Sequence, residues 1–182
     1  MHLTARKGAL GDGGFTLIDM LFVVALVGLL ATMAIPGLMR ARGAAQASSA
    51  LASLRVINSG ELSYAITCGL GFYSPDLPTL GVVPPGNIDA FLPADLTTGL
   101  TVIKSGYNFS LAGIPLGGAP ATCNGLAAGM ASPAYAAVAD PLDPNLPRYY
   151  GVNADGTIYV HSATLSAVMP ESGPPPIGTA IQ

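Results

Sequence analysis

The sequence has few charged residues, no tryptophan, and only two histidines and two cysteines. Charged residues make up 9% of its 182 residues, against about 25% in an average soluble domain. Seven basic residues at a net charge of −3 cannot supply the phosphate contacts of a typical nucleic-acid-binding protein, so we predict no nucleic-acid partner. Because 51% of the residues are hydrophobic, a disordered polyelectrolyte is excluded. We expect something other than water to cover part of the surface.

Motifs of common enzymes are absent from the sequence. It contains no G-x-S-x-G, no H-E-x-x-H and no P-loop. The histidines are His2 and His161, and the second lies in a segment with the pattern of an aromatic strand, where we expect a structural role. We therefore predict that the chain is not an enzyme, has no catalytic residues and needs no cofactor.

The two cysteines, Cys68 and Cys123, are 55 positions apart. Two cysteines exclude a four-cysteine zinc site and a dense disulfide framework. They either form one bridge, worth roughly 2–4 kcal/mol, or remain two buried thiols. We favour the bridge, because the apolar segment described next indicates export to an oxidising compartment.

Residues 20–39 carry no charge and are mostly apolar. About 20 such residues in a helix cross the roughly 30 Å of bilayer hydrocarbon, so this segment predicts a membrane span. A cleaved signal peptide is the alternative, but the block is long and residues 36–40 are a poor cleavage site. Two basic residues precede the span and two follow it, so the positive-inside rule does not decide its orientation.

An amphipathic helical pattern continues over residues 40–67. Apolar residues at three- and four-residue steps predict its buried stripe, namely Ala47, Leu51, Leu54, Leu62 and Ile66. Three further residues, Ala50, Ile57 and Ala65, widen this stripe. Together with the apolar segment, this pattern predicts one helix from about Phe15 to Thr67. Pro36 lacks the N–H of the helix ladder, so we expect an interruption or kink near it.

Fifteen of the sixteen prolines follow residue 68, so long helices are not expected there. Residues 69–100 are expected to be rich in loops, and 170–182 to form a flexible tail. The segments with strand patterns lie within 103–162 and predict a small antiparallel sheet of about four strands: 107–111, 135–139, 148–152 and 157–161. Asp155–Gly156 is a hairpin signal between the last two. The predicted fold class is α+β, with a long kinked N-terminal helix packed on the sheet.

Asp19 places a carboxylate at the edge of the apolar run. An ionisable group within a membrane span costs a few kcal/mol and indicates a functional site. The spacing Thr16-x-x-Asp19 also fits a helix capping box, in which the carboxylate has a local structural role. The residue pattern alone leaves both interpretations open.

The N-terminal segment resembles the class III signal of type IV pilins and type II secretion pseudopilins. That family has a short basic leader ending in glycine, then Phe-Thr-Leu-Ile-Glu, then an apolar helix with a glycine and a proline. Seven residues carry the resemblance in the same order: Arg6, Lys7, Gly14, Phe15, Asp19, Gly28 and Pro36. It covers about the first 65 residues, and Asp19 departs from it by standing where the family has glutamate.

The resemblance implies that a prepilin peptidase in the bacterial inner membrane removes residues 1–14 by cutting between Gly14 and Phe15, and N-methylates the Phe15 amine. Assembly machinery would then extract the subunit from the membrane into a helical homopolymer. The helix 15–39 would form the filament core and residues 40–169 the globular head. Asp19 would pair with the Phe15 amine of a neighbouring copy, while Gly28 and Pro36 would loosen the helix.

Several alternatives remain open on the sequence. The filament is either a surface pilus or the periplasmic pseudopilus of a type II secretion system, and Asp19 in place of glutamate leaves open a major or a minor subunit. Similar pseudopilins bind calcium in a loop of the sheet, which makes Asp140, Asp143 and Asp155 weak metal candidates, although turn chemistry also explains these residues. A signal-anchored periplasmic binding or enzymatic domain is the rival from another class.

Overall fold

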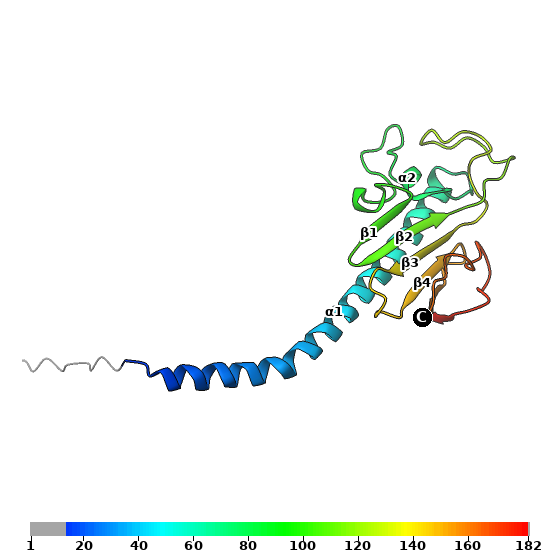
Figure 1. Cartoon of the computed structure of the whole chain (residues 1–182). Helices are drawn as coiled ribbons and strands as arrows, with labels where there is room; N and C mark the ends of the chain where they lie inside the picture. The colour runs from blue at the N-terminus through cyan, green and yellow to red at the C-terminus, as the bar shows by residue number, and fades with distance from the viewer. Residues whose placement is uncertain (1–13, 182) are drawn as a thin grey trace, which may run out of the picture. The chain divides into compact units, whose positions relative to one another are not determined.

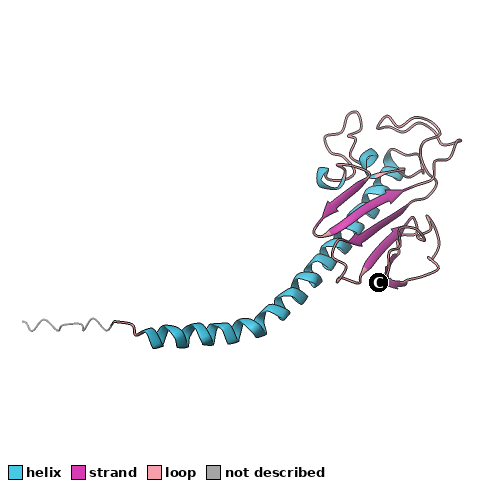
Figure 2. Ribbon diagram, viewed as in Figure 1, coloured by secondary structure: helices cyan, strands magenta, loops and turns pink. Residues whose placement is uncertain are grey.

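The computed structural model describes residues 14–181 (Figures 1 and 2). The predicted leader, with Arg6 and Lys7, lies outside these residues except for Gly14. The elements, in chain order, are α1 (Leu17–Thr67), α2 (Leu77–Leu80), the 3₁₀ helix η1 (Ala94–Leu96), β1 (Thr101–Lys104), β2 (Tyr107–Ala112), β3 (Ala136–Pro141), β4 (Tyr149–Asn153), β5 (Ile158–His161) and β6 (Thr179–Ile181). The chain divides after Arg42 into two compact units. We call residues 14–42 the stem and residues 43–181 the head.

The stem consists of the N-terminal half of α1 and the residues before it. Helix α1 is assigned without a break from Leu17 to Thr67, so of the two expectations at Pro36, an interruption or a kink, the interruption is wrong. The side chains of the stem are all exposed. The proline removes one ladder hydrogen bond, and the remaining bonds of the 51-residue helix keep it continuous.

The head confirms the α+β class. Its six strands form one antiparallel sheet in the order β1-β2-β3-β4-β5-β6, so every strand pairs with its neighbour in sequence. Alternate residues of β2 point to the inner face, where Tyr107, Phe109 and Leu111 are buried. They share one core with Leu54 and Ile57 of α1. The sheet therefore buries one face against the C-terminal half of this helix.

The strand number corrects the prediction of about four. Four strands lie where the sequence pattern placed them, and Asp155–Gly156 lies in the turn between β4 and β5. Strand β1 was missed because its two apolar residues, Val102 and Ile103, are adjacent and do not alternate with polar ones. Strand β6 lies in the segment expected to be a flexible tail, and it pairs with β5 through Thr179 and Val160. A three-residue strand is too short for its alternation to be recognised in a sequence.

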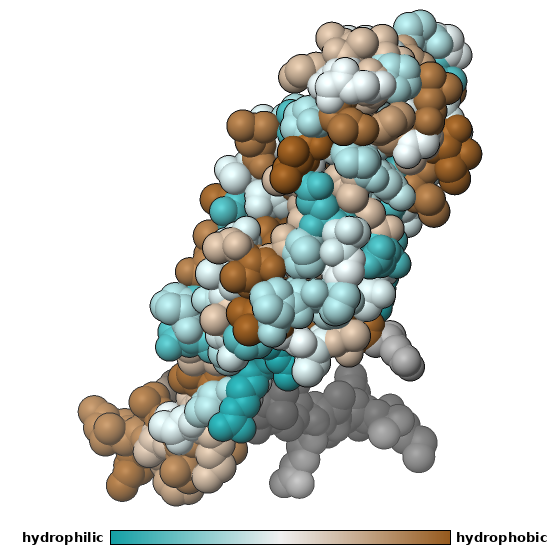
Figure 3. Space-filling view, turned by 90° about the vertical axis from the view of Figure 1, so that its right-hand side faces the viewer, coloured by the Kyte–Doolittle hydropathy of each residue, from teal (hydrophilic) through white to brown (hydrophobic). Residues whose placement is uncertain are grey.

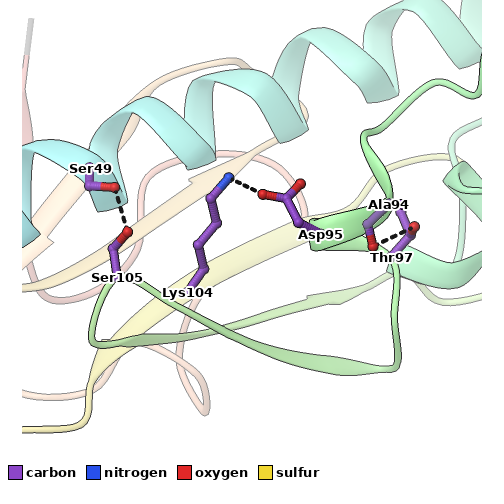
Figure 4. Close-up of polar contacts among 6 residues, drawn as sticks. All are labelled: Ser49, Ala94, Asp95, Thr97, Lys104 and Ser105. Atoms are coloured by element: carbon purple, nitrogen blue, oxygen red, sulfur yellow. Dashed lines mark hydrogen bonds and ion pairs between the residues drawn. The ribbon is translucent and has the colours of Figure 1, made fainter.

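The first hairpin of the sheet is tied to α1 and to η1 (Figure 4). Ser105 and Gly106 connect β1 to β2 with φ angles of 51° and 81°, as a two-residue turn with two left-handed positions requires. The Ser105 hydroxyl lies 2.9 Å from the Ser49 hydroxyl, and Lys104 pairs with Asp95 at 2.8 Å. These contacts fix the hairpin beside the first turns of α1 in the head.

The buried face of α1 differs from the predicted stripe. Buried residues recur at steps of three and four: Gly43, Ala47, Ala50, Leu54, Ile57, Glu61 and Tyr64. Ala47, Ala50, Leu54 and Ile57 were predicted correctly. Leu62 and Ile66 are 52% and 73% exposed, so their assignment to the core was wrong. Glu61 and Tyr64 occupy the buried positions that we had assigned to Leu62 and Ile66. A search for purely apolar residues does not select a glutamate or a tyrosine.

Candidate functional site

The N-terminus of α1 is a capping box. The Asp19 carboxylate accepts hydrogen bonds from the Thr16 backbone N–H at 3.1 Å and from the Thr16 hydroxyl at 2.6 Å. In return, the Asp19 N–H donates to the Thr16 hydroxyl oxygen at 3.3 Å. The structure therefore shows the local role that the spacing predicted. The group is fully exposed in the single chain, so its carboxylate remains accessible to a further partner.

An apolar surface follows this cap. The first half of α1 holds an 18-residue window with a mean hydropathy of 2.5, none of which is buried. Phe15 and Leu17 are 76% and 79% exposed. Among the described residues, α1 is the one helix that is long and apolar enough to cross a membrane. By its length and composition, a helix of this kind near the N-terminus is suited to be a membrane anchor or a signal sequence.

The glycines of the resemblance, Gly14 and Gly28, lie in open space among the described residues. A Cβ atom added to Gly14 or Gly28 would have nothing within 4 Å. Packing inside the chain therefore does not require glycine at either position. Apart from the helix loosening that the resemblance implies for Gly28, a requirement for glycine at these positions would come from a second molecule, such as a peptidase or a neighbouring helix.

The two cysteines form the predicted bridge. Cys68 and Cys123 are joined, with their Cα atoms 4.9 Å apart. Cys68 follows the last residue of α1, and the Cys123 N–H donates to the Cys68 carbonyl at 3.3 Å. The bridge thus attaches the long loop between β2 and β3 to the end of α1.

Removing this bridge is expected to destabilise the head strongly. A cross-link that closes 55 residues lowers the entropy of the unfolded chain by an amount worth about 4 kcal/mol. The double variant Cys68→Ser/Cys123→Ser should lose about that much free energy of unfolding in urea titrations followed by tyrosine fluorescence. Reductant should shift the wild type by the same amount and leave the double variant unchanged. An unchanged urea midpoint in the double variant would contradict this assignment.

Glu61 is a buried carboxyl that the sequence analysis missed. It has no exposed surface, although it belongs to a helix that packs on an apolar core. One carboxyl oxygen, Oε2, accepts from the Ser74 N–H at 2.9 Å, and the other has no hydrogen-bond partner among the described residues. The signal that would have found it is its spacing from Ile57 and Tyr64, which continues the buried stripe.

The surroundings of Glu61 favour its neutral form. Burial raises the pKa of the carboxyl well above its usual value, and the nearby Asp76 carboxylate raises it further, while the Ser74 N–H acts in the opposite direction. Tyr64 and Tyr135 lie close enough for the charge of Glu61 to raise their pKa values. No basic group contributes to the pKa of Glu61. The carboxyl therefore keeps its proton to a higher pH than an exposed glutamate does.

This burial predicts a pH dependence of stability. The folded state binds a proton that the unfolded chain releases near pH 4.5. The free energy of unfolding should therefore be highest below that pH and fall as the pH rises through the raised pKa, by up to about 1.4 kcal/mol per pH unit. Glu61→Gln, which keeps an acceptor for Ser74, should abolish this slope in urea titrations at different pH values. The matched control Glu171→Gln should keep it. A slope that persists in Glu61→Gln would contradict the assignment.

The weak calcium candidates do not converge. Asp140 accepts from the Thr164 hydroxyl, Asp143 from the Asn145 N–H and amide, and Asp155 from the Gly173 N–H. Each carboxylate thus serves a separate local contact. Within residues 14–181 no three acidic, histidine or cysteine side chains form a group that could hold a metal ion.

Two grooves lie in the head. The first, of about 290 Å³, runs along α1 and is lined by Arg55, Val56, Ser59, Gly60, Ser63 and Phe91. The second, of about 360 Å³, lies on the outer face of β2 and β3 and includes Glu171, whose carboxylate accepts from the Ile114 N–H at 2.6 Å. Apolar patches also remain exposed among polar ones on the face of the head in Figure 3.

Comparisons with known proteins found no matching family model, no similar curated protein and no similar solved structure. The fold and the site therefore define the class of this protein only broadly. It has an α+β head closed by one disulfide and an apolar N-terminal helix that is suited to be an anchor or a signal.

Proposed function

We propose that the chain is a structural subunit of a type IV pilus-like filament. The observation that carries the proposal is the exposed apolar half of α1, which continues into a disulfide-closed α+β head and begins at a capped carboxylate. An exposed apolar surface of this length needs a bilayer or other protein around it. In a filament subunit the membrane covers this surface first, and the bundle of helices at the filament core covers it after assembly.

The absence of a cation for Asp19 in the described part of its own chain supports assembly by identical subunits. A carboxylate moved into an apolar bundle is severely penalised unless a cation compensates it. The only ion pair among residues 14–181 joins Lys104 and Asp95, so the described part of the chain offers Asp19 no cation. The amine at Phe15, created by cleavage after Gly14, is the proposed partner in a neighbouring copy. A contact between different surfaces of identical subunits that does not close produces an open helix.

The proposed pathway has three partners besides the chain itself. A prepilin peptidase removes the leader and methylates Phe15, the inner membrane holds the subunit through one span, and the assembly machinery extracts it. The finer assignment that we propose is a cell-surface pilus. The same steps apply to a pseudopilus, in which the filament stays in the periplasm.

Fractionation of the producing cells tests this proposal. The chain should be recovered from sheared surface material, in a high-speed pellet that contains filaments labelled along their length by antibodies to the head. A non-assembling deletion of residues 17–39 serves as the control. Recovery of the full chain solely as a membrane-bound monomer would instead support the signal-anchored periplasmic domain.

A further inference from the structure

Arg55 is an unusual residue on the exposed side of α1. Between Gly43 and Thr67 this helix carries two charged side chains, Arg55 and the buried Glu61. The exposed side is otherwise made of small, apolar or hydroxyl side chains, which is not the composition of a solvated helix face. Within the described part of the chain, Arg55 forms no ion pair.

The groove beside Arg55 has the chemistry to bind an acidic side chain with an apolar neighbour. Arg55, Ser59 and Ser63 follow one another at four-residue steps, so their side chains lie along one ridge of the helix. Val56 and Phe91 provide apolar walls. The guanidinium group supplies the charge that a carboxylate requires, and the walls accept an aliphatic side chain.

The head carries two exposed segments of matching chemistry. Ile88–Asp89 lies close in sequence to Phe91, a wall of the groove itself. Leu142–Asp143 lies in the loop between β3 and β4, where Leu142 is 53% exposed. The Asp143 oxygen Oδ1 accepts twice from Asn145 at 2.9 Å, which leaves Oδ2 for a partner and holds the loop in shape.

The position of the second segment favours a contact between copies. The Leu142 N–H donates to Gly106, which lies beside Gln46, and Leu146 of the same loop lies against Gly43. The groove lies along Arg55 to Ser63 instead. The distance along the helix from Gln46 to Ser59 is about 20 Å, so the loop of one head is displaced along α1 from its own groove.

We propose that the groove of Arg55 and Phe91 receives Leu142–Asp143 of a second copy of this chain. The two contacting surfaces differ, so the contact does not close into a two-fold dimer and can repeat along an open helix. If Ile88–Asp89 of the second copy occupied the groove instead, the two contacting surfaces would lie beside each other on each copy, which would favour a closed dimer. This inference rests on the proposed filament and specifies a contact between its heads.

A charge exchange tests the contact in processed full-length protein. Arg55→Asp and Asp143→Arg should each reduce the yield of sheared filaments about tenfold, because each places like charges together. The double variant Arg55→Asp/Asp143→Arg should recover to within about threefold of the wild type. The control Asp89→Arg should assemble normally and should not rescue Arg55→Asp. Intact masses and the urea midpoints of the monomers must match the wild type.

The possible results distinguish a failure of this contact from a failure of the proposed filament. Normal assembly of Arg55→Asp, or rescue by Asp89→Arg in place of Asp143→Arg, would overturn the contact and leave the filament standing. Absence of filaments from the wild type would overturn both. Rescue solely in the Arg55→Asp/Asp143→Arg double variant would support the contact as described.

Discussion

Asp19→Ala should leave the chain processed and inserted in the membrane but reduce its recovery in filaments about a hundredfold or more. The proposed cause is the Phe15 amine of the neighbouring copy, which would remain buried without its counter-ion. Breaking a buried ion pair by removing one partner costs about 3–5 kcal/mol, enough to prevent incorporation. The measurement is the ratio of sheared filament protein to membrane protein, with the intact mass of each.

Two further variants separate the charge of Asp19 from its capping role. Asp19→Asn keeps an oxygen that can accept from the Thr16 N–H and hydroxyl but has no charge, and it should fail like alanine. Asp19→Glu keeps the charge and should assemble. Normal filament yield from either uncharged variant would show that the carboxylate acts only as a helix cap.

Gly14→Asp should prevent maturation almost completely. In the single chain a side chain at Gly14 meets nothing within 4 Å, so the substitution disturbs no internal packing. Its effect must therefore come from contact with the peptidase, for which the resemblance implies a glycine before the cut. The protein in membranes should keep the mass of the uncleaved chain.

The matched control for this variant is Gly28→Ala, which also introduces a side chain into open space. It should be cleaved normally, because the position lies beyond the residues that a cut after Gly14 would involve. An intact mass of residues 15–182 from Gly14→Asp would refute the proposed need for glycine before the cut.

The sequence predicted the parts of the fold that rest on long patterns. A continuous helix over more than 50 residues leaves a strong signal, and its observed end at Thr67 agrees with the prediction. Strands with aromatic alternation, such as β2, were also found. Strand β6 was not, since its three residues gain their structure by pairing with β5 rather than from their own preference.

The candidate site was predictable to a smaller extent. The spacing of Thr16 and Asp19 predicted their hydrogen bonds, because a capping box is a local arrangement. The bridge between the two cysteines was predicted without any geometry, because the apolar segment indicated export to an oxidising compartment. The burial of Glu61 was not predicted, because it depends on Ser74 and the surrounding core, which tertiary packing alone brings together.

The most direct test of the account is the N-terminal sequence and intact mass of this protein purified from sheared surface material of its native host. The account predicts a chain that begins with N-methylated Phe15 and has the mass of residues 15–182 with one methyl group and one disulfide. A polypeptide that still begins with Met1, or that is found only as a monomer in the membrane, would contradict it.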